Sequence, residues 1–334
     1  MYESFYKLRA KPFQLNPDPN FFFGSKGHKR AMSYLEYGLH QGEGFIVITG
    51  EVGAGKTTLV RNLFRKLDTN NVVAAQLVST QLDADDMLRM VAAAFGLPHE
   101  DASKAVLLKK LEAFLLACAG QGKRALLVVD EAQNLTPRAV EELRMLSNFQ
   151  TAEKSLLQSF LLGQPEFRYT LQSEGMQQLR QRVIASYHLG PLDPPETMAY
   201  IEHRLRAVGW EGDPVFDSEV FAAVHDYTGG IPRKINTLCD RLLLLGCLEE
   251  KHALGRQDIE EVIRDLQQEM ILPETRPSAT AEAESAERGR NAGLTLESLD
   301  ERVSKMEESV LAVLRLSREI LSLPRIKRFR NESR

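Results

Sequence analysis

The sequence predicts an α/β fold in which a parallel sheet is covered by helices on both faces and is followed by a smaller helical domain. Up to about residue 190, short apolar runs alternate with longer stretches of helical periodicity. Near-continuous apolar strands separated by helices are typical of a parallel sheet buried on both faces. From Pro194 to about Met270 the strand-like runs stop and only helical periods continue. The 334 residues are enough for about two such domains.

The expected strands are five apolar runs, and the helical domain contains four helical patterns. The strands are Phe45–Thr49, Val72–Val78, Ala125–Asp130, Leu156–Leu162 and Ala185–Leu189. The helices are Glu196–Val208, Asp217–Thr228, Pro232–Glu249 and Gln257–Met270. The pair Gly229-Gly230 is a stop signal before the helix that opens at Pro232. We therefore expect a core over residues 1–193 and a helical domain over residues 194–270.

Residues 271–334 differ in composition from the rest of the chain. Residues 271–293 hold few large apolar side chains, so burial cannot offset the entropy of ordering, and we predict a disordered linker. In residues 294–323 apolar side chains recur every three or four positions, which predicts an amphipathic helix. That helix either forms a short coiled coil or folds back on the body. The tail over residues 324–334 is basic, and it is either solvated or contacts an anionic membrane surface or nucleic acid.

Overall composition excludes several classes of protein. The 42 basic and 46 acidic residues argue against a protein that coats nucleic acid over a whole face, so we do not expect nucleic acid as a partner. Three cysteines without a CxxC spacing indicate neither a disulfide framework nor a zinc site, and a reducing cytoplasm is expected. We expect no signal peptide and no integral membrane segment, because no apolar run approaches about 18 residues. Any membrane contact is then peripheral, at the inner membrane.

A glycine-rich segment directly follows the first strand. Its residues, Gly50-Glu51-Val52-Gly53-Ala54-Gly55-Lys56-Thr57, match the pattern GxxxxGK[ST] and precede a helical stretch. The glycines let backbone N–H groups surround a phosphate at the helix N-terminus, where the helix dipole also favours an anion. Lys56 would then reach the β- and γ-phosphates, and the Thr57 hydroxyl would ligate Mg²⁺. The alternative is a glycine-rich turn that binds no nucleotide.

Two adjacent acids follow the third strand. Asp130 ends the apolar strand, and Glu131 comes next. An aspartate at this position can hold Mg²⁺, and the glutamate is placed to polarise an attacking water. The alternative is a pair of acids in a solvated loop. One strand fits between Lys56 and Asp130, which is typical of hydrolysing P-loop ATPases, and the absence of an NKxD motif favours ATP over GTP.

Polar residues at three later positions are candidates for sensing or stabilising the phosphates. Gln164 follows the fourth strand at the edge where ligands bind in open α/β sheets, so it could orient the attacking water or sense the γ-phosphate. The alternative is a polar loop residue beside a proline. Arg180 and Arg182 precede the last strand, and they are either solvated or supply an arginine finger to a neighbouring subunit's ATP. Arg233 follows Pro232 in the first turn of its helix, from which it would point toward the γ-phosphate.

This order of motifs resembles that of the AAA+ ATPases. The segments MYESFYKLRAKPFQLNPDPNFFFGS, GEVGAGKTTL, VVDEAQNL, LLGQPEF, LRQRV and TGGIPRKINTLCDRLLL are similar to the ATPase domain of general secretion pathway protein A and its relatives. GLHQGEGFIVITGEVGAGKTTL and QLVSTQLDADDMLRMVAAAFGL look most like the ATPase encoded beside exosortase systems, which sort PEP-CTERM proteins and export exopolysaccharide. The resemblance covers residues 1 to about 270.

The resemblance implies roles for individual residues, with ATP and Mg²⁺ as ligands. The implied phosphate contacts are Gly53, Gly55, Lys56, Thr57 and Thr58. The other implied roles are Mg²⁺ binding by Thr57 and Asp130, catalysis by Glu131, a first sensor at Gln164, a finger at Arg182 or Arg180, and a second sensor at Arg233. Phe13, Phe22 and His28 lie in a segment similar to the part that borders adenine.

The resemblance also implies partners. These are further copies of the chain, in a ring or partial ring, and components of envelope secretion or polysaccharide export. Many proteins of this type continue into a transmembrane helix and a periplasmic domain. We expect neither here, and so no direct contact with the cell wall.

Two other functions stay open. An ATP-switched DNA-binding regulator, similar to transposition ATPases, is disfavoured by the charge balance and by the lack of a recognisable helix-turn-helix. A nucleotide-gated scaffold would use the C-terminal helix to tether partners.

Overall fold

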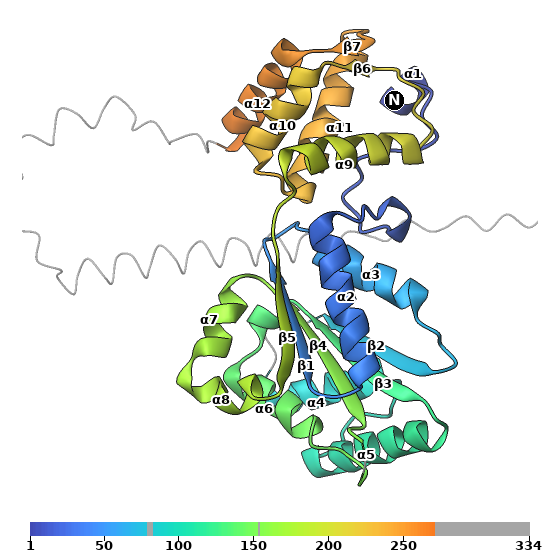
Figure 1. The fold of residues 1–334 in the computed structure, drawn as a ribbon, viewed down its shortest axis with the longest axis vertical. Helices are drawn as coiled ribbons and strands as arrows, with labels where there is room; N and C mark the ends of the chain where they lie inside the picture. The colour runs from blue at the N-terminus through green and yellow to red at the C-terminus, as the bar shows by residue number, and fades with distance from the viewer. Residues whose placement is uncertain (79–82, 153, 271–334) are drawn as a thin grey trace, which may run out of the picture. The chain divides into compact units, whose positions relative to one another are not determined.

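A parallel sheet of five strands forms the centre of the α/β core (Figure 1). In a computed structural model of the chain, the structure describes residues 1–78, 83–152 and 154–270. The expected linker 271–293, helix 294–323 and tail 324–334 lie outside these residues. The strands are β1 (Phe45–Gly50), β2 (Val72–Val78), β3 (Arg124–Asp130), β4 (Leu157–Gly163) and β5 (Val183–Leu189). Their order in the sheet is β2-β3-β4-β1-β5.

The five predicted strands are confirmed, with ends that differ by at most two residues. They are readable in the sequence because β1 and β4 are buried at every position. The order of the strands in the sheet could not be predicted from the spacing of the motifs along the sequence. The strand between Lys56 and Asp130 in the sequence is β2, and it lies at the sheet edge, whereas β4 separates β1 from β3. The phosphate loop and the Asp130 strand therefore flank the end of β4.

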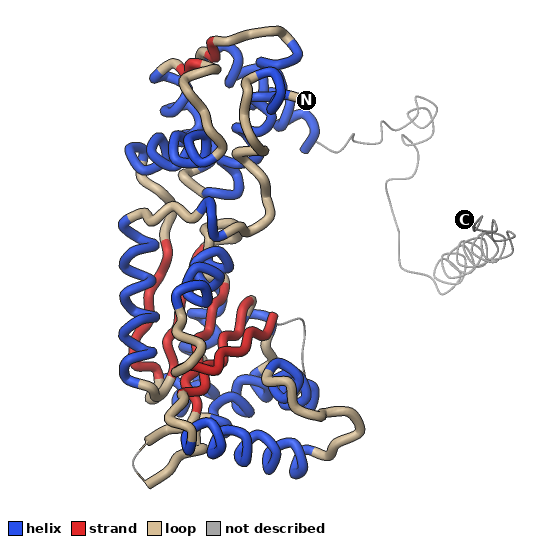
Figure 2. The backbone as a smooth tube through the Cα atoms, turned by 90° about the vertical axis from the view of Figure 1, so that its right-hand side faces the viewer, coloured by secondary structure: helices blue, strands red, loops and turns tan. Residues whose placement is uncertain are grey.

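Helices cover both faces of the sheet (Figure 2). One face carries α2 (Lys26–Gln41) and α3 (Lys56–Lys66). The other carries α4 (Ala84–Ala94), α5 (Lys104–Gly120), α6 (Pro137–Leu146), α7 (Glu166–Gln172) and α8 (Gln177–Arg180). Alternate residues of one strand face opposite ways, so Ile46 packs toward α2 while Val47 packs toward the other layer.

Four helices form the second domain, here called the lid. They are α9 (Pro194–Ala207), α10 (Ser218–Thr228), α11 (Pro232–Leu248) and α12 (Arg256–Met270). Each lies within two residues of its predicted bounds, and α9 begins at Pro194 because Asp193 and Glu196 form a capping box. The lid also has a short parallel pair, β6 (Val215–Phe216) and β7 (Ala253–Leu254), which was not predicted. Two residues are too few to produce a periodicity.

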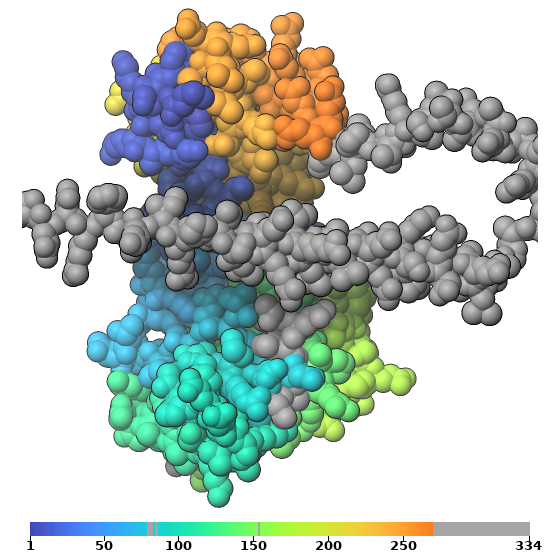
Figure 3. Space-filling model, turned by 180° about the vertical axis from the view of Figure 1, so that it is seen from behind, coloured from blue at the N-terminus to red at the C-terminus, as the bar shows by residue number. Residues whose placement is uncertain are grey.

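The first residues of the chain pack on the lid, not on the core with which the expected boundaries grouped them. From helix α1 (Tyr2–Phe5) to Phe13, the side chains of Tyr2, Tyr6, Leu8 and Phe13 are buried in the lid's apolar cluster. Figure 3 shows this blue segment beside the orange part of the lid. The physical reason is a set of bulky aromatic side chains that fill the space beside α11. Residues 14–25, here called the crossing segment, then lead to α2 and include the turn η1 (Pro19–Phe21).

Candidate active site

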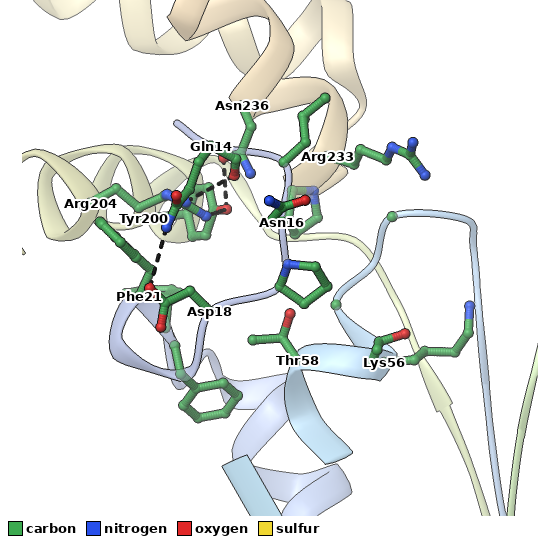
Figure 4. A pocket seen from close by; sticks show the side chains of 18 of the residues that line it. Gln14, Asn16, Asp18, Phe21, Lys56, Thr58, Tyr200, Arg204, Arg233 and Asn236 are labelled. Carbon is green, nitrogen blue, oxygen red and sulfur yellow. Dashed lines mark hydrogen bonds between the residues drawn. The ribbon is translucent and has the colours of Figure 1, made fainter. Parts of the chain in front are cut away.

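A cavity of about 380 Å³ lies at the carboxyl edge of the sheet, bordered by the core, the crossing segment and the lid (Figure 4). Its core side is formed by Glu131 and by residues of the loop and helix start over 52–58. Its other walls come from the crossing segment and from α9 and α11. Ligands of open α/β sheets bind at this edge, so the sequence-predicted loop and acids meet where a ligand is expected.

The glycine-rich loop has a backbone that depends on two of its glycines. Gly53 has φ 84° and Gly55 has φ 99°, in the left-handed region that side-chain-bearing residues rarely adopt. A Cβ on Gly53 would lie 2.4 Å from the Cβ of Arg233, and one on Gly55 would lie 2.7 Å from Nε2 of His28. Helix α3 begins at Lys56, so the loop leads straight into a helix N-terminus that favours an anion.

Lys56 is folded onto its own loop. Its Nζ donates to the carbonyl oxygens of Gly50, at 2.6 Å, and Glu51, at 3.0 Å. Burial lowers the pKa of Lys56, while the nearby carboxylates, Glu131 first, act in the opposite direction. The ammonium group is thus satisfied by acceptors that a phosphate can replace.

Thr57 and Asp130 meet as predicted. The Thr57 hydroxyl donates to Oδ2 of Asp130 at 2.9 Å. Asp130 is buried, and burial raises the pKa of its carboxyl group. A hydroxyl and a carboxylate in contact at a phosphate loop are the hard oxygen donors that Mg²⁺ prefers, so these residues fit the ion.

Glu131 and Gln164 also meet. Nε2 of Gln164 donates to Oε2 of Glu131 at 3.3 Å, across the ends of β3 and β4. Glu131 has φ 56°, a left-handed conformation that costs about 1 kcal/mol or more for such a residue, and its N–H donates to Oδ1 of Asp130 at 3.0 Å. The sequence reasoning missed Gln133, which donates to the same carboxylate.

Arg233 connects the lid to the phosphate loop. It is the second residue of α11, its side chain is exposed and lines the cavity, and its N–H donates to the carbonyl of Gly53 at 3.2 Å. The predicted lid arginine is therefore at the cavity.

Arg180 and Arg182 are not brought to the cavity. Arg182 precedes β5, whose first residue pairs with Phe45 at the start of β1, whereas the phosphate loop follows the end of β1. The seven residues of β5 span roughly 20 Å. Both arginines therefore lie at the amino ends of the strands, whereas the phosphate loop lies at their carboxyl ends. Arg182 donates to Oγ of Ser147 at 2.5 Å and to the side chain of Asn148, and Arg180 donates to two nearby backbone carbonyls.

Two of the three residues expected to border adenine line the cavity. Phe22 and His28 do so, whereas Phe13 is buried in the lid cluster. Nε2 of His28 lies 3.1 Å from the carbonyl of Ala54, and Nδ1 lies 2.7 Å from the Ser25 hydroxyl. A carbonyl only accepts, so we assign the proton to Nε2. Burial lowers the pKa of His28 and favours this neutral form.

A polar network on the lid, absent from the sequence prediction, forms the far wall of the cavity. Buried Arg204 donates through Nε to the carbonyl of Pro12, at 2.6 Å, and through Nη2 to that of Gln14, at 3.2 Å. Its Nη1 donates to the Tyr200 hydroxyl, which donates to Oδ1 of Asn236 (Figure 4). The sequence carries little signal for this network. Arg204 is a charged residue within a helix, and its spacing alone does not show that it is buried.

Comparison with known proteins bears on the family and the fold. Residues 39–171 match the family described as AAA domain. The chain is 40% identical over 260 residues to general secretion pathway protein A of Aeromonas hydrophila, and this match covers 78% of the chain and 47% of that protein. The chain therefore spans about half the length of this curated relative.

Solved structures with a similar fold include an ORC2 protein and a Cdc6p. The Aeropyrum pernix ORC2 protein, determined in ADPNP and ADP complexes, has a TM-score of 0.59 and 16% identity, over 77% of this chain and 71% of that chain. Cdc6p of Pyrobaculum aerophilum has a TM-score of 0.57 and 15% identity, over 76% and 70%. The described residues have the P-loop AAA+ fold. No helix among them has the length and apolar character needed to cross a membrane.

Proposed function

We propose that the protein is an AAA+ ATPase that hydrolyses ATP to ADP and phosphate. The observation that carries the proposal is the contact cluster at the carboxyl edge of the sheet. There Thr57 bonds to Asp130, and Gln164 bonds to Glu131, all beside the phosphate loop. A triphosphate on the loop would place its γ-phosphate between the two acids and the lid arginine, Arg233.

The substrate is held mainly by the loop and the first turn of α3. Backbone N–H groups from Gly53 to Thr58 would surround the phosphates, and Lys56 would exchange its two carbonyl acceptors for phosphate oxygens. Thr57 and Asp130 would hold Mg²⁺, which neutralises phosphate charge when it is bound. The base and sugar would occupy the part of the cavity lined by the crossing segment, Tyr200 and Asn236.

Hydrolysis needs a base beside the attacking water. Glu131 lines the cavity, and its carboxylate accepts a hydrogen bond from Gln164. We assign Glu131 to polarise the water and Gln164 to sense the γ-phosphate. Arg233 would stabilise negative charge on that phosphate from the lid, so closure of the lid depends on whether ATP or ADP is bound.

A second copy of the chain completes the site in this proposal. Arg182 lies at the amino ends of the strands, and the phosphate loop lies at the carboxyl ends, so Arg182 is too far to reach the ATP of its own subunit. A neighbour packed against the amino ends would receive Arg182, or Arg180, as its arginine finger. The protein would then act as a ring or partial ring.

For the cellular role we propose envelope secretion. The support is the 40% identity to general secretion pathway protein A, over about half of that protein. The finer assignment, to an exosortase system that sorts PEP-CTERM proteins with exopolysaccharide export, rests on the segments quoted above. We place the protein in the cytoplasm with peripheral contact at the inner membrane.

A subunit-mixing experiment tests hydrolysis at a shared site. Phosphate release is measured for wild type, Glu131→Gln, Arg182→Ala, and a mixture of the two variants. Each variant alone is expected to be nearly inactive while still binding ATP. In the mixture, an Arg182→Ala subunit retains Glu131 and receives Arg182 from a Glu131→Gln neighbour, so activity returns in part.

The outcomes separate the parts of the proposal. If the wild type releases no phosphate, the proposed activity is wrong. If Arg182→Ala keeps full activity, Arg182 is not the finger; Arg180→Ala is then measured in the same way, and its loss of activity would assign the finger to Arg180. If the mixture recovers nothing although both variants fold and bind ATP, the site is not shared between subunits.

A further inference from the structure

Gln133 makes a closed ring of hydrogen bonds with Glu131 and Gln164. Its Nε2 donates to Oε2 of Glu131 at 2.6 Å. Its Oε1 accepts from the backbone N–H of Gln164 at 3.0 Å, and Nε2 of Gln164 donates to the same oxygen of Glu131 at 3.3 Å. One amide side chain therefore uses both its donor and its acceptor to connect the ends of two adjacent strands.

The turn that carries Gln133 is well anchored. Gln133 lies in the single-turn helix η2 (Ala132–Asn134), directly after β3. Its neighbours Ala132 and Leu135 are buried in the apolar cluster beneath the sheet. This burial fixes the backbone of the turn, so the amide has little freedom to leave the carboxylate.

The two bonds to Glu131 have a shared geometric consequence. Both amides donate to Oε2, so together they set the rotation of the carboxylate group. The bond from Gln133 is the shorter of the two, and a bond to a charged acceptor is stronger than one between neutral groups. A glutamate side chain with several rotatable bonds would otherwise sample many orientations, few of which face the substrate water.

We propose that Gln133 is a positioning residue that holds the carboxylate of Glu131 in the orientation needed for hydrolysis and keeps it hydrogen-bonded to Gln164. The inference rests on the proposed ATPase function. Glu131 lines the cavity, and the two hydrogen bonds of the Gln133 amide go to Glu131 and to the backbone N–H of Gln164, so Gln133 acts through Glu131. Neither amide contacts Oε1 of Glu131, so Oε1 would be the oxygen that polarises the water.

The test compares Gln133→Ala and Gln133→Glu with wild type in steady-state ATP hydrolysis. Gln133→Ala is expected to lower kcat by about 10-fold and to leave KM and the Kd for ATP unchanged. Gln133→Glu keeps the acceptor for the Gln164 N–H but replaces the donor with a second carboxylate, so its loss of kcat is expected to be at least as large. Exposed Gln172, at the end of α7, supplies the control variant Gln172→Ala, for which no change is expected.

A double variant shows whether Gln133 acts through Glu131. Adding Gln133→Ala to Glu131→Gln is expected to leave the residual turnover unchanged, since the carboxylate to be positioned is already gone. An unchanged kcat in folded Gln133→Ala, or full activity in Gln133→Glu, would overturn the proposal. These results presuppose a wild type that hydrolyses ATP and a Glu131→Gln whose turnover is low but measurable, so failure of the proposed function is seen separately.

Discussion

The two ends of the cavity are built in different ways. The phosphate-loop end is lined by Glu131 and by residues between 52 and 58, and behind them Asp130 bonds to Thr57 and Gln164 bonds to Glu131. These residues lie at or just after the ends of parallel strands. The crossing-segment end consists of residues 14–23 with Tyr200, Arg204 and Asn236, which are far apart in the sequence. The first end is positioned by the sheet, and the second by packing between the N-terminal residues and the lid.

This difference separates two kinds of function. A phosphate is recognised by backbone N–H groups and a few charged side chains, which a short local motif can supply. The wall at the other end depends on one buried arginine that holds two carbonyls of the N-terminal segment. We therefore expect changes at the first end to affect chemistry, and changes at the second to affect folding stability and general nucleotide affinity.

The largest effect is expected at the phosphate-loop end. Lys56→Ala should lower the rate of phosphate release by about 100-fold or more, because it removes a preorganised charge from the phosphates. Exposed Lys66→Ala, at the other end of α3, is the matched control and should have no effect. Equal rates for the two variants would show that the loop does not hold the reacting phosphates.

At the crossing-segment end, Arg204→Met should lower the free energy of unfolding by about 3 kcal/mol, because it leaves buried carbonyls without their charged donor. It should also weaken ATP and ADP binding by the same factor. Chemical denaturation and nucleotide titration measure the two effects. Arg206→Ala, on the same helix but in an exposed ion pair with Glu202, should cost less than about 1 kcal/mol. Comparable losses for both variants would contradict a structural role specific to Arg204.

The sequence was informative where chemistry is local and uninformative where packing assembles it. The glycine loop and Asp130-Glu131 were readable because each follows a buried strand within a few residues. Arg204 and Asn236 were not, since their partners lie elsewhere in the chain. Gln133 was visible beside Glu131, but only the position of β4 next to β3 brings Gln164 into the same ring.

Arg233 gives a smaller effect that differs between the two nucleotides. Arg233→Ala should raise the Kd for ATP by about 10-fold and the Kd for ADP much less, because only ATP offers the charged group that the lid arginine would contact. Exposed Lys234→Ala, the next residue of α11, is the control. Isothermal titration with both nucleotides makes the comparison, and an equal loss for ATP and ADP would remove Arg233 from γ-phosphate sensing.

The smallest effect concerns His28, which connects the start of α2 to the phosphate loop. Burial lowers the pKa of His28 in the folded state, so the unfolded chain binds more protons below pH about 6.5, and folding stability should fall as the pH is lowered through this range. His28→Gln should flatten this part of the dependence in denaturation experiments between pH 5.5 and 7.5. Exposed His40→Gln, on the same helix, should leave it intact. An unchanged slope in His28→Gln would assign the dependence to other groups.

The most direct measurement of the central claim is made on Glu131→Gln with radiolabelled ATP. The variant should bind ATP with the wild-type Kd, because the phosphate loop, Lys56 and Thr57 are untouched, and it should release only a small fraction of the labelled phosphate that the wild type releases in the same time. Phosphate release at the wild-type rate, or loss of ATP binding together with turnover, would contradict the assignment of Glu131 as the residue that polarises the attacking water.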